Sequence, residues 1–291
     1  MNNVLNATEA RRKAAEWLAS YYPSTENLEA IAISGSTARG GADDWSDIEL
    51  AMFWKQAPAE DMRLDPIQKA GGVISRKVIA DSDYFFAVEN FKVGDMCFDV
   101  VHNLSARFFS LIEQVVSRND INPKKQEVVA MASSFVGLRG EALVNTFQDR
   151  SKPYSDVFQK KVLENLEFPT PNQFNMHSER RDTIAFQKCL TNGVEQVLQA
   201  LCAINRRYYP GSKRAHWLVD SLEQKPDDLL SKMEQAFFGD YNHSKKIFES
   251  LVGETLELFP KALNLKEPFQ ARRLDGRRIE LTPSQINGAI K

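Results

Sequence analysis

Two carboxylates separated by a single residue give this sequence its clearest chemical signal. Asp47 and Glu49 fall in the apolar stretch 47–53, which is typical of a β-strand. Residues i and i+2 of a strand point to the same face, so we expect the two carboxylates to stand side by side. Like charges this close repel each other, and a hard divalent cation such as Mg²⁺ or Mn²⁺ removes that cost. The pattern therefore predicts a metal site.

A Gly-Ser turn lies just upstream of these acids. Gly35 and Ser36 follow the apolar run 29–33, and they offer small side chains, backbone N–H groups and a hydroxyl, which suit a phosphate chain. The stretch does not match the dinucleotide fingerprint G-x-G-x-x-G, and no Lys-Ser or Lys-Thr follows Gly40 as a P-loop requires. An isolated D-x-E pair is more often a solvated strand end, but the preceding strand and turn favour the metal and phosphate interpretation.

Asp99 is the third acid of interest. It lies in the predicted strand 95–102, which is otherwise mostly apolar, and a carboxylate there must be paired, liganded or neutral. The alternative is an edge-strand Asp that faces water. We predict instead that Asp99 stands beside the first two carboxylates. Asp95 is its competitor but belongs to a turn, Glu89 is a weaker candidate for a base or substrate contact, and His102 could approach the site from the strand end.

These motifs resemble the signature of a known family. The residues that carry the resemblance are Gly35-Ser36, Arg39-Gly40 and Asp47-x-Glu49. They are similar to the DNA polymerase β-type nucleotidyltransferase superfamily, and most of all to its two-domain aminoglycoside and lincosamide branch. The family pattern is a Gly-Ser turn, a loop and two carboxylates one residue apart, and Glu49 stands where many members carry Asp. The resemblance is strong over residues 29–54 and weak elsewhere.

The resemblance implies a metal-dependent enzyme that moves an NMP, AMP from ATP or the equivalent from another NTP, onto a hydroxyl of a small molecule. An aminoglycoside or lincosamide antibiotic is the implied acceptor. The implied metal ligands and catalytic residues are Asp47, Glu49 and Asp99, and the implied phosphate contacts are Gly35, Ser36 and Arg39. Members of the superfamily also modify proteins or RNA ends. A toxin-like transferase acting on tRNA or protein, and a catalytically inactive nucleotide-binding or antitoxin partner, are therefore the alternatives.

A basic segment in the second half of the chain is the next candidate. Residues 205–214 (NRRYYPGSKR) gather four cations and two aromatic rings around a Pro-Gly turn. Cations with aromatic rings suit a nucleoside triphosphate, although a cationic helix end that complements the helix dipole would look the same. The segment is similar to a stretch in the helical domains of some two-domain nucleotidyltransferases. That resemblance implies that Lys213 meets the triphosphate and that Tyr208 or Tyr209 lies near it.

Length and periodicity predict an α+β protein of two domains. The 291 residues exceed the usual size of one domain. Strand patterns at 72–79, 83–91 and 95–102 predict an N-terminal catalytic domain, residues 1–145, with a mixed sheet flanked by helices. Helical periodicity thereafter predicts a C-terminal helical bundle for substrate binding, residues 146–291.

Composition limits the partners. The net charge of −2 gives no electrostatic footprint for duplex nucleic acid, so tRNA is a less favoured partner than an NTP and a small hydroxyl acceptor. The sequence contains no run of 18 apolar residues, so no membrane span is expected. Three dispersed cysteines and the absence of a secretory pattern at the first residues favour a cytoplasmic location. The oligomeric state does not follow from the sequence.

Overall fold

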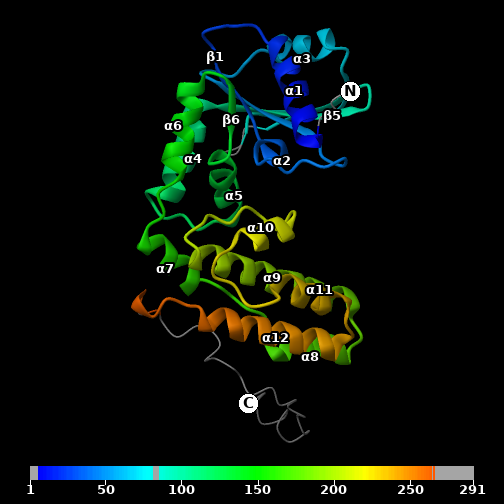
Figure 1. Cartoon of the computed structure of the whole chain (residues 1–291), viewed down its shortest axis with the longest axis vertical. Coiled ribbons are helices and arrows are strands. Elements are labelled where there is room, and N and C mark those ends of the chain that lie inside the picture. The colour runs from blue at the N-terminus through cyan, green and yellow to red at the C-terminus, as the bar shows by residue number, and fades with distance from the viewer. Residues whose placement is uncertain (1–5, 81–84, 264, 266–291) are drawn as a thin grey trace, which may run out of the picture. The chain divides into compact units, whose positions relative to one another are not determined.

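The structure is a computed structural model that describes residues 6–80, 85–263 and 265 of the chain (Figure 1). Its contacts divide the chain into two compact units. The first comprises Met1–Lys161 together with Arg206–Lys213, and the second comprises Val162–Asn205 together with Arg214–Lys291. The boundary at 145–146 expected from sequence falls within the helix α6 (Glu141–Ser151). Residues 83–84 of a predicted strand and 266–291 of the predicted helical domain lie outside the described residues.

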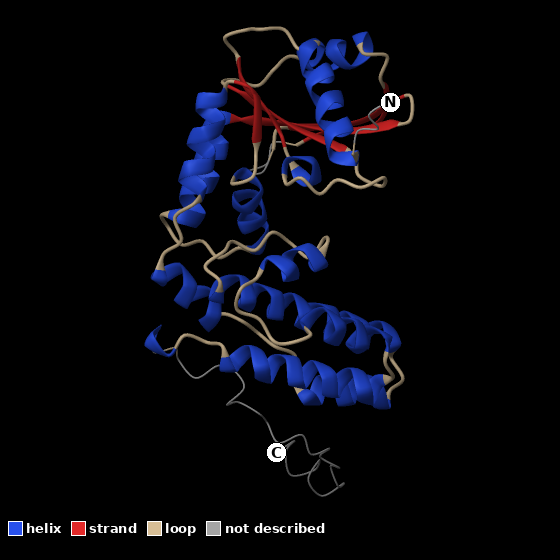
Figure 2. Ribbon diagram, viewed as in Figure 1, coloured by secondary structure: helices blue, strands red, loops and turns tan. Residues whose placement is uncertain are grey.

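A six-stranded mixed sheet forms the centre of the first unit, as Figure 2 shows in red. In chain order its strands are β1 (Leu28–Ile33), β2 (Ile48–Trp54), β3 (Val73–Ile79), β4 (Ala87–Val93), β5 (Met96–Leu104) and β6 (Val136–Arg139). The spatial order is β3-β4-β5-β2-β1-β6, and β2 and β5 run parallel while the other neighbouring pairs are antiparallel. The two central strands β2 and β5 are those that carry the predicted acids.

Alternation along β2 produces two apolar layers. Its even-numbered residues from Ile48 to Trp54 are buried in a core shared with α1 (Ala7–Ser20) and α3 (Glu60–Lys69). On the opposite face, Phe53 packs its ring on Phe108 of α4 (Ser105–Val116), with centroids 5.0 Å apart, and on Phe147 of α6 at 4.7 Å. Glu49 points to the Phe53 face because the two differ by an even number of residues.

Helices make up the described part of the second unit. They are the end of α7 (Asp156–Glu164), then α8 (Pro171–Glu179), α9 (Thr183–Ile204), α10 (Ala215–Ser221), α11 (Leu229–Phe238), α12 (Tyr241–Glu257) and the short 3₁₀ helix η1 (Lys261–Leu263). Phe174 packs against Phe186 and Phe248, with ring centroids 5.3 and 5.2 Å apart. At Gly193 of α9 a side chain would overlap the Phe248 ring, so the glycine allows α9 and α12 to approach closely. The predicted fold class, α+β with a mixed sheet followed by helices, is confirmed.

Two further features of the chain are the character of its helices and the state of its cysteines. None of the helices in residues 6–80 and 85–263 combines the length and the apolar character that a bilayer crossing requires. The three cysteines are free, with Cys97 exposed, Cys189 partly buried and Cys202 buried.

Candidate active site

The three predicted carboxylates meet on neighbouring strands. In the parallel β2–β5 pair, Glu49 lies opposite Asp99, so both side chains project from the same face of the sheet. Asp47 directly precedes β2 and shares that face by its i, i+2 spacing from Glu49. The antiparallel neighbour β4 places Asn90 opposite Asp99 on the other side.

Asp99 has a carboxylate neighbour and an amide neighbour. Burial is the largest cause that raises the pKa of Asp99, and the hydrogen bond that Asn90 Nδ2 donates to Asp99 Oδ1 lowers it. The charge of Asp47 and a hydrogen bond between the carboxyl groups of Asp47 and Asp99 raise it further. A hydrogen bond between two carboxyl groups requires a proton on one of them, and a cation can take the place of that proton. The pair of Asp47 and Asp99 is therefore an oxygen donor set that fits a hard divalent ion.

Glu49 lies deeper in the same group. Burial is the largest cause that raises the pKa of Glu49, and the charge of Asp47 raises it further, while Lys213 and Arg39 lower it. Burial therefore makes the ionised form of Glu49 costly, and the charges of Lys213 and Arg39 offset part of that cost. Lys213 also lowers the pKa of Asp99, so one lysine compensates two of the three acids.

The predicted Gly-Ser turn is a one-turn helix, α2 (Gly35–Ala38), that begins directly after β1. Gly35 has φ of +62°, a left-handed conformation that glycine adopts without strain. A Cβ at this position would overlap the Glu49 carboxylate. Ser34 N–H donates to Glu49 O at 2.9 Å, which joins the end of β1 to the start of β2. Gly35 thus makes room for Glu49, while Ser36 is buried beside it.

As the side chains stand, no group of three or more His, Cys, Asp or Glu residues in the described part of the chain is arranged to hold a metal ion. The Glu49 carboxylate is turned toward Gly35, whereas Asp47 and Asp99 face each other. The donor chemistry of the pair fits a divalent ion, and Glu49 can join such a site only when its carboxylate leaves Gly35. The metal assignment accordingly stays a proposal.

The basic segment Arg206–Lys213 belongs to the first unit, and its middle is anchored by aromatic packing. Tyr208 is 8% exposed, its hydroxyl donates to Pro153 O, and its ring lies 5.0 Å from that of Tyr154 and 5.1 Å from that of Phe158. Tyr208 therefore serves to hold the segment in place. Arg206 adds an ion pair with Asp156, Nη1 to Oδ1, at 2.6 Å.

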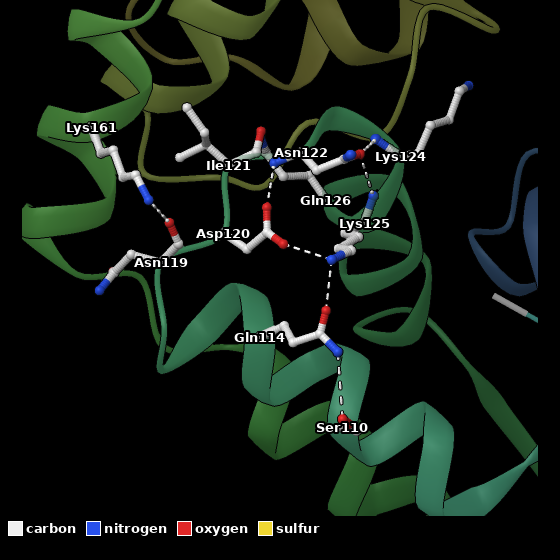
Figure 3. Close-up of polar contacts among 10 residues, drawn as sticks. All are labelled: Ser110, Gln114, Asn119, Asp120, Ile121, Asn122, Lys124, Lys125, Gln126 and Lys161. Carbon is white, nitrogen blue, oxygen red and sulfur yellow. Dashed lines mark hydrogen bonds and ion pairs between the residues drawn. The ribbon is translucent and has the colours of Figure 1, made fainter. Parts of the chain in front are cut away.

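A buried amide on α5 (Pro123–Ala132) holds the same segment from its other side. Gln126 is 2% exposed, its Nε2 donates to Ile121 O at 2.9 Å and its Oε1 accepts from Tyr209 N at 3.2 Å. The loop before α5 is itself fixed by Lys125, whose Nζ contacts Asp120 Oδ2 and Gln114 Oε1, both at 2.6 Å (Figure 3). These contacts fix the backbone that leads to Lys213. Sequence reasoning missed Gln126, which has no motif.

Gln126→Leu is expected to loosen this segment. The substitution keeps the side-chain size but leaves the N–H of Tyr209 and the carbonyl of Ile121 without their partner, and each such buried group costs about 1–3 kcal/mol. Hydrogen exchange should report faster exchange of the Tyr209 amide, and nucleotide affinity should fall if Lys213 contributes to it. Lys124→Ala is the matched control, because its pair with Glu127 lies at the surface and stabilises little. Unchanged protection at Tyr209 in Gln126→Leu would contradict the anchoring role.

Glu89 and His102 lie on the opposite face of the sheet from Asp99, in the core. Glu89 pairs with Arg63 of α3, and the two side chains are 0% and 2% exposed. His102 Nδ1 accepts from Trp54 Nε1 at 2.9 Å, and its Nε2 lies 2.8 Å from Glu89 Oε2. Burial, and secondarily the charge of Arg63, lower the pKa of His102 to about 3, so it is neutral at physiological pH. Both residues form a structural network rather than part of the acidic group.

Arg63→Met is expected to destabilise the protein by about 3–5 kcal/mol, because it leaves the Glu89 carboxylate buried without its partner. Urea unfolding measures the effect. The double variant Arg63→Met/Glu89→Leu removes both charges and should regain most of the lost stability. If Glu89→Leu abolished nucleotide binding while the protein stayed folded, Glu89 would belong to the active site after all.

A groove of the first unit lies away from the acids. It has a volume of about 490 Å³ and is lined mainly by side chains of α4 and α6, among them Phe109, Ile112, Val116 and Thr146. None of the predicted site residues lines it. The like charges of the acids favour a compensating cation, which makes the acids the candidate site.

Comparison with known proteins adds little. No family model matches the chain, and no curated protein is similar to it. Among solved structures, a nucleotidyltransferase-like protein from Exiguobacterium sibiricum 255-15 is similar over 97% of this chain and 86% of that one, with 11% sequence identity and a TM-score of 0.28. A likeness at that TM-score carries no argument about function, so the assignment rests on the residues described above.

Proposed function

We propose that this protein is a metal-dependent nucleotidyltransferase that moves an NMP from an NTP onto a hydroxyl acceptor. The observation that carries the proposal is the convergence of Asp47, Glu49 and Asp99 on one sheet face beside Gly35 and Ser36. The pKa values of Glu49 and Asp99 are raised, in part by the charge of Asp47, so a cation at these carboxylates would be favourable. The small-residue turn beside them suits a phosphate chain.

In this proposal each residue has a defined role. Gly35 and Ser36 bind the β- and γ-phosphates through N–H groups, which lack intrahelical partners in the first turn of a helix, and through the Ser36 hydroxyl. Arg39 and Lys213 supply positive charge for the phosphates. Their presence near the acids is supported by the lowering of the Glu49 pKa by both. Asp99 accepts the proton of the acceptor hydroxyl, which its raised pKa favours.

Asp47, Asp99 and Glu49 would hold one or two Mg²⁺ or Mn²⁺ ions. Such ions neutralise charge on the α-phosphate and on the leaving pyrophosphate. For the donor we propose ATP, and for the acceptor a small hydroxyl compound such as an aminoglycoside or lincosamide. The family resemblance of the motif supports both choices, and an acceptor on tRNA or protein is the outcome that a wider screen would reveal.

Thermal shift with ATP, GTP, CTP and UTP, with and without Mg²⁺, tests the binding part of this proposal. At least one nucleotide should raise the melting temperature in a metal-dependent way. The shift should vanish in Asp47→Asn and persist in Asp44→Asn, which removes an exposed carboxylate from the same loop. No shift with any nucleotide would overturn the proposal. A shift that needs no metal and survives in Asp47→Asn would favour a nucleotide-binding partner without chemistry.

A further inference from the structure

An exposed tryptophan lies in the loop that leads to the acids. The side chain of Trp45 is 95% exposed, two residues before Asp47. Trp54, by contrast, is fully buried, and Trp17 is 37% exposed and meets the Tyr21 ring edge-on with centroids 5.2 Å apart. A fully solvated indole forgoes the burial that makes this side chain favourable inside proteins. A ligand that covers the Trp45 ring would therefore gain the free energy of burying it.

The loop that carries Trp45 is held in a defined conformation. Within the loop, Asp43 Oδ1 accepts from Trp45 N at 3.1 Å and from Ser46 Oγ at 2.8 Å. The flanks are tied to α1, because Arg11 Nε donates to Ser46 O at 2.7 Å and Ala42 N donates to Thr8 Oγ1 at 3.1 Å. The backbone on both sides of the indole is thus fixed, so its exposure does not come from a loose chain. A backbone held in this way presents the exposed ring at a defined place, which lowers the entropic cost of stacking.

We propose that Trp45 is the residue on which the nucleobase of the donor nucleotide stacks. This inference rests on the proposed function. In the proposed function the α-phosphate of the donor nucleotide lies at the acids, and only the ribose separates that phosphate from the base. An extended chain advances about 3.3–3.6 Å per residue, so the Trp45 backbone lies within roughly 7 Å of the Asp47 backbone. The neighbouring acids Asp43 and Asp44 disfavour phosphate at this part of the loop, which leaves the uncharged base as the ligand for the indole.

Calorimetric titration with two Mg²⁺-loaded probes tests the inference: the NTP that binds wild type most tightly, and tripolyphosphate, which has no base. Trp45→Ala should weaken binding of the NTP about tenfold, and Trp45→Phe should retain most of the affinity because it keeps an aromatic face. Binding of tripolyphosphate should not change in either variant. Phe238→Ala is the control, since this aromatic side chain is 89% exposed on α11 and has no assigned role.

Three outcomes would overturn the inference, and they are distinguishable. If wild type binds the nucleotide and Trp45→Ala binds it equally well, Trp45 does not contact the base, while the proposed function stands. An equal loss of NTP and tripolyphosphate affinity in Trp45→Ala would likewise reject stacking, because it would show a distorted phosphate site. If wild type binds neither probe, the proposed function fails and this inference fails with it.

Discussion

Asp47→Asn is expected to lower NMP transfer about a thousandfold while leaving the protein at least as stable as wild type. The loss follows because the metal ions would contribute several kcal/mol to the barrier, and each 1.36 kcal/mol is tenfold in rate. The stability follows because the Asp47 charge raises the pKa of Asp99, so the two carboxylates destabilise each other in the absence of a cation. Pyrophosphate release and urea unfolding, measured on the same preparation, provide both values.

Two nearby acids serve as controls for this prediction. Asp44→Asn removes an exposed carboxylate three residues from Asp47, and Asp95→Asn removes an exposed one four residues from Asp99. Both variants should keep wild-type turnover, because neither side chain belongs to the acidic group. If Asp47→Asn turned over as fast as wild type with full metal dependence, the metal assignment would be refuted.

Gly35→Ala is expected to reduce transfer about a hundredfold. A Cβ at this position overlaps the Glu49 carboxylate, so either α2 or Glu49 must move, and a displacement of about 1 Å at a catalytic site can cost that factor. The variant also places alanine at a φ of +62°, which costs roughly 1–2 kcal/mol of stability. Steady-state kinetics and unfolding measure the two effects separately.

Gly40→Ala separates strain from overlap. Gly40 also has a positive φ, +79°, but a Cβ there meets nothing within 4 Å. We expect it to lose a similar amount of stability and to keep most of its activity. The double variant Gly35→Ala/Glu49→Asp shortens the opposing side chain by one methylene and should recover part of the lost activity. Equal activity losses in Gly35→Ala and Gly40→Ala would show that the overlap with Glu49 has no role.

The acidic group was accessible from sequence because its geometry follows from strand alternation. Asp47 and Glu49 share a face by spacing alone, and Asp99 stood out as a charge within an apolar strand. The register that sets Glu49 opposite Asp99 could not be predicted. It depends on how two strands about 50 residues apart pair, and local sequence patterns do not specify that pairing. Asn90 was missed for the same reason: only the β4–β5 register shows that it faces Asp99.

Other parts of the fold carried too little local signal. The strand β6 has four residues, all only partly buried, and the helical pattern before it gave no indication that it pairs with β1. The Gly-Ser turn is the short helix α2, which begins at the left-handed Gly35, and no helical periodicity in the sequence indicates it. The basic segment was identified by its composition, but its attachment depends on contacts such as Tyr209 with Gln126, which are 83 residues apart.

Following the α-phosphate of the donor tests the proposed NMP transfer itself. Wild type and Asp47→Asn would be incubated with α-labelled ATP, Mg²⁺ and a panel of aminoglycosides, lincosamides and tRNA. Wild type should transfer the label to an acceptor and release one pyrophosphate per transfer, and Asp47→Asn should do neither. Release of orthophosphate without an acceptor, or equal release of pyrophosphate by the two proteins, would contradict the proposed transfer.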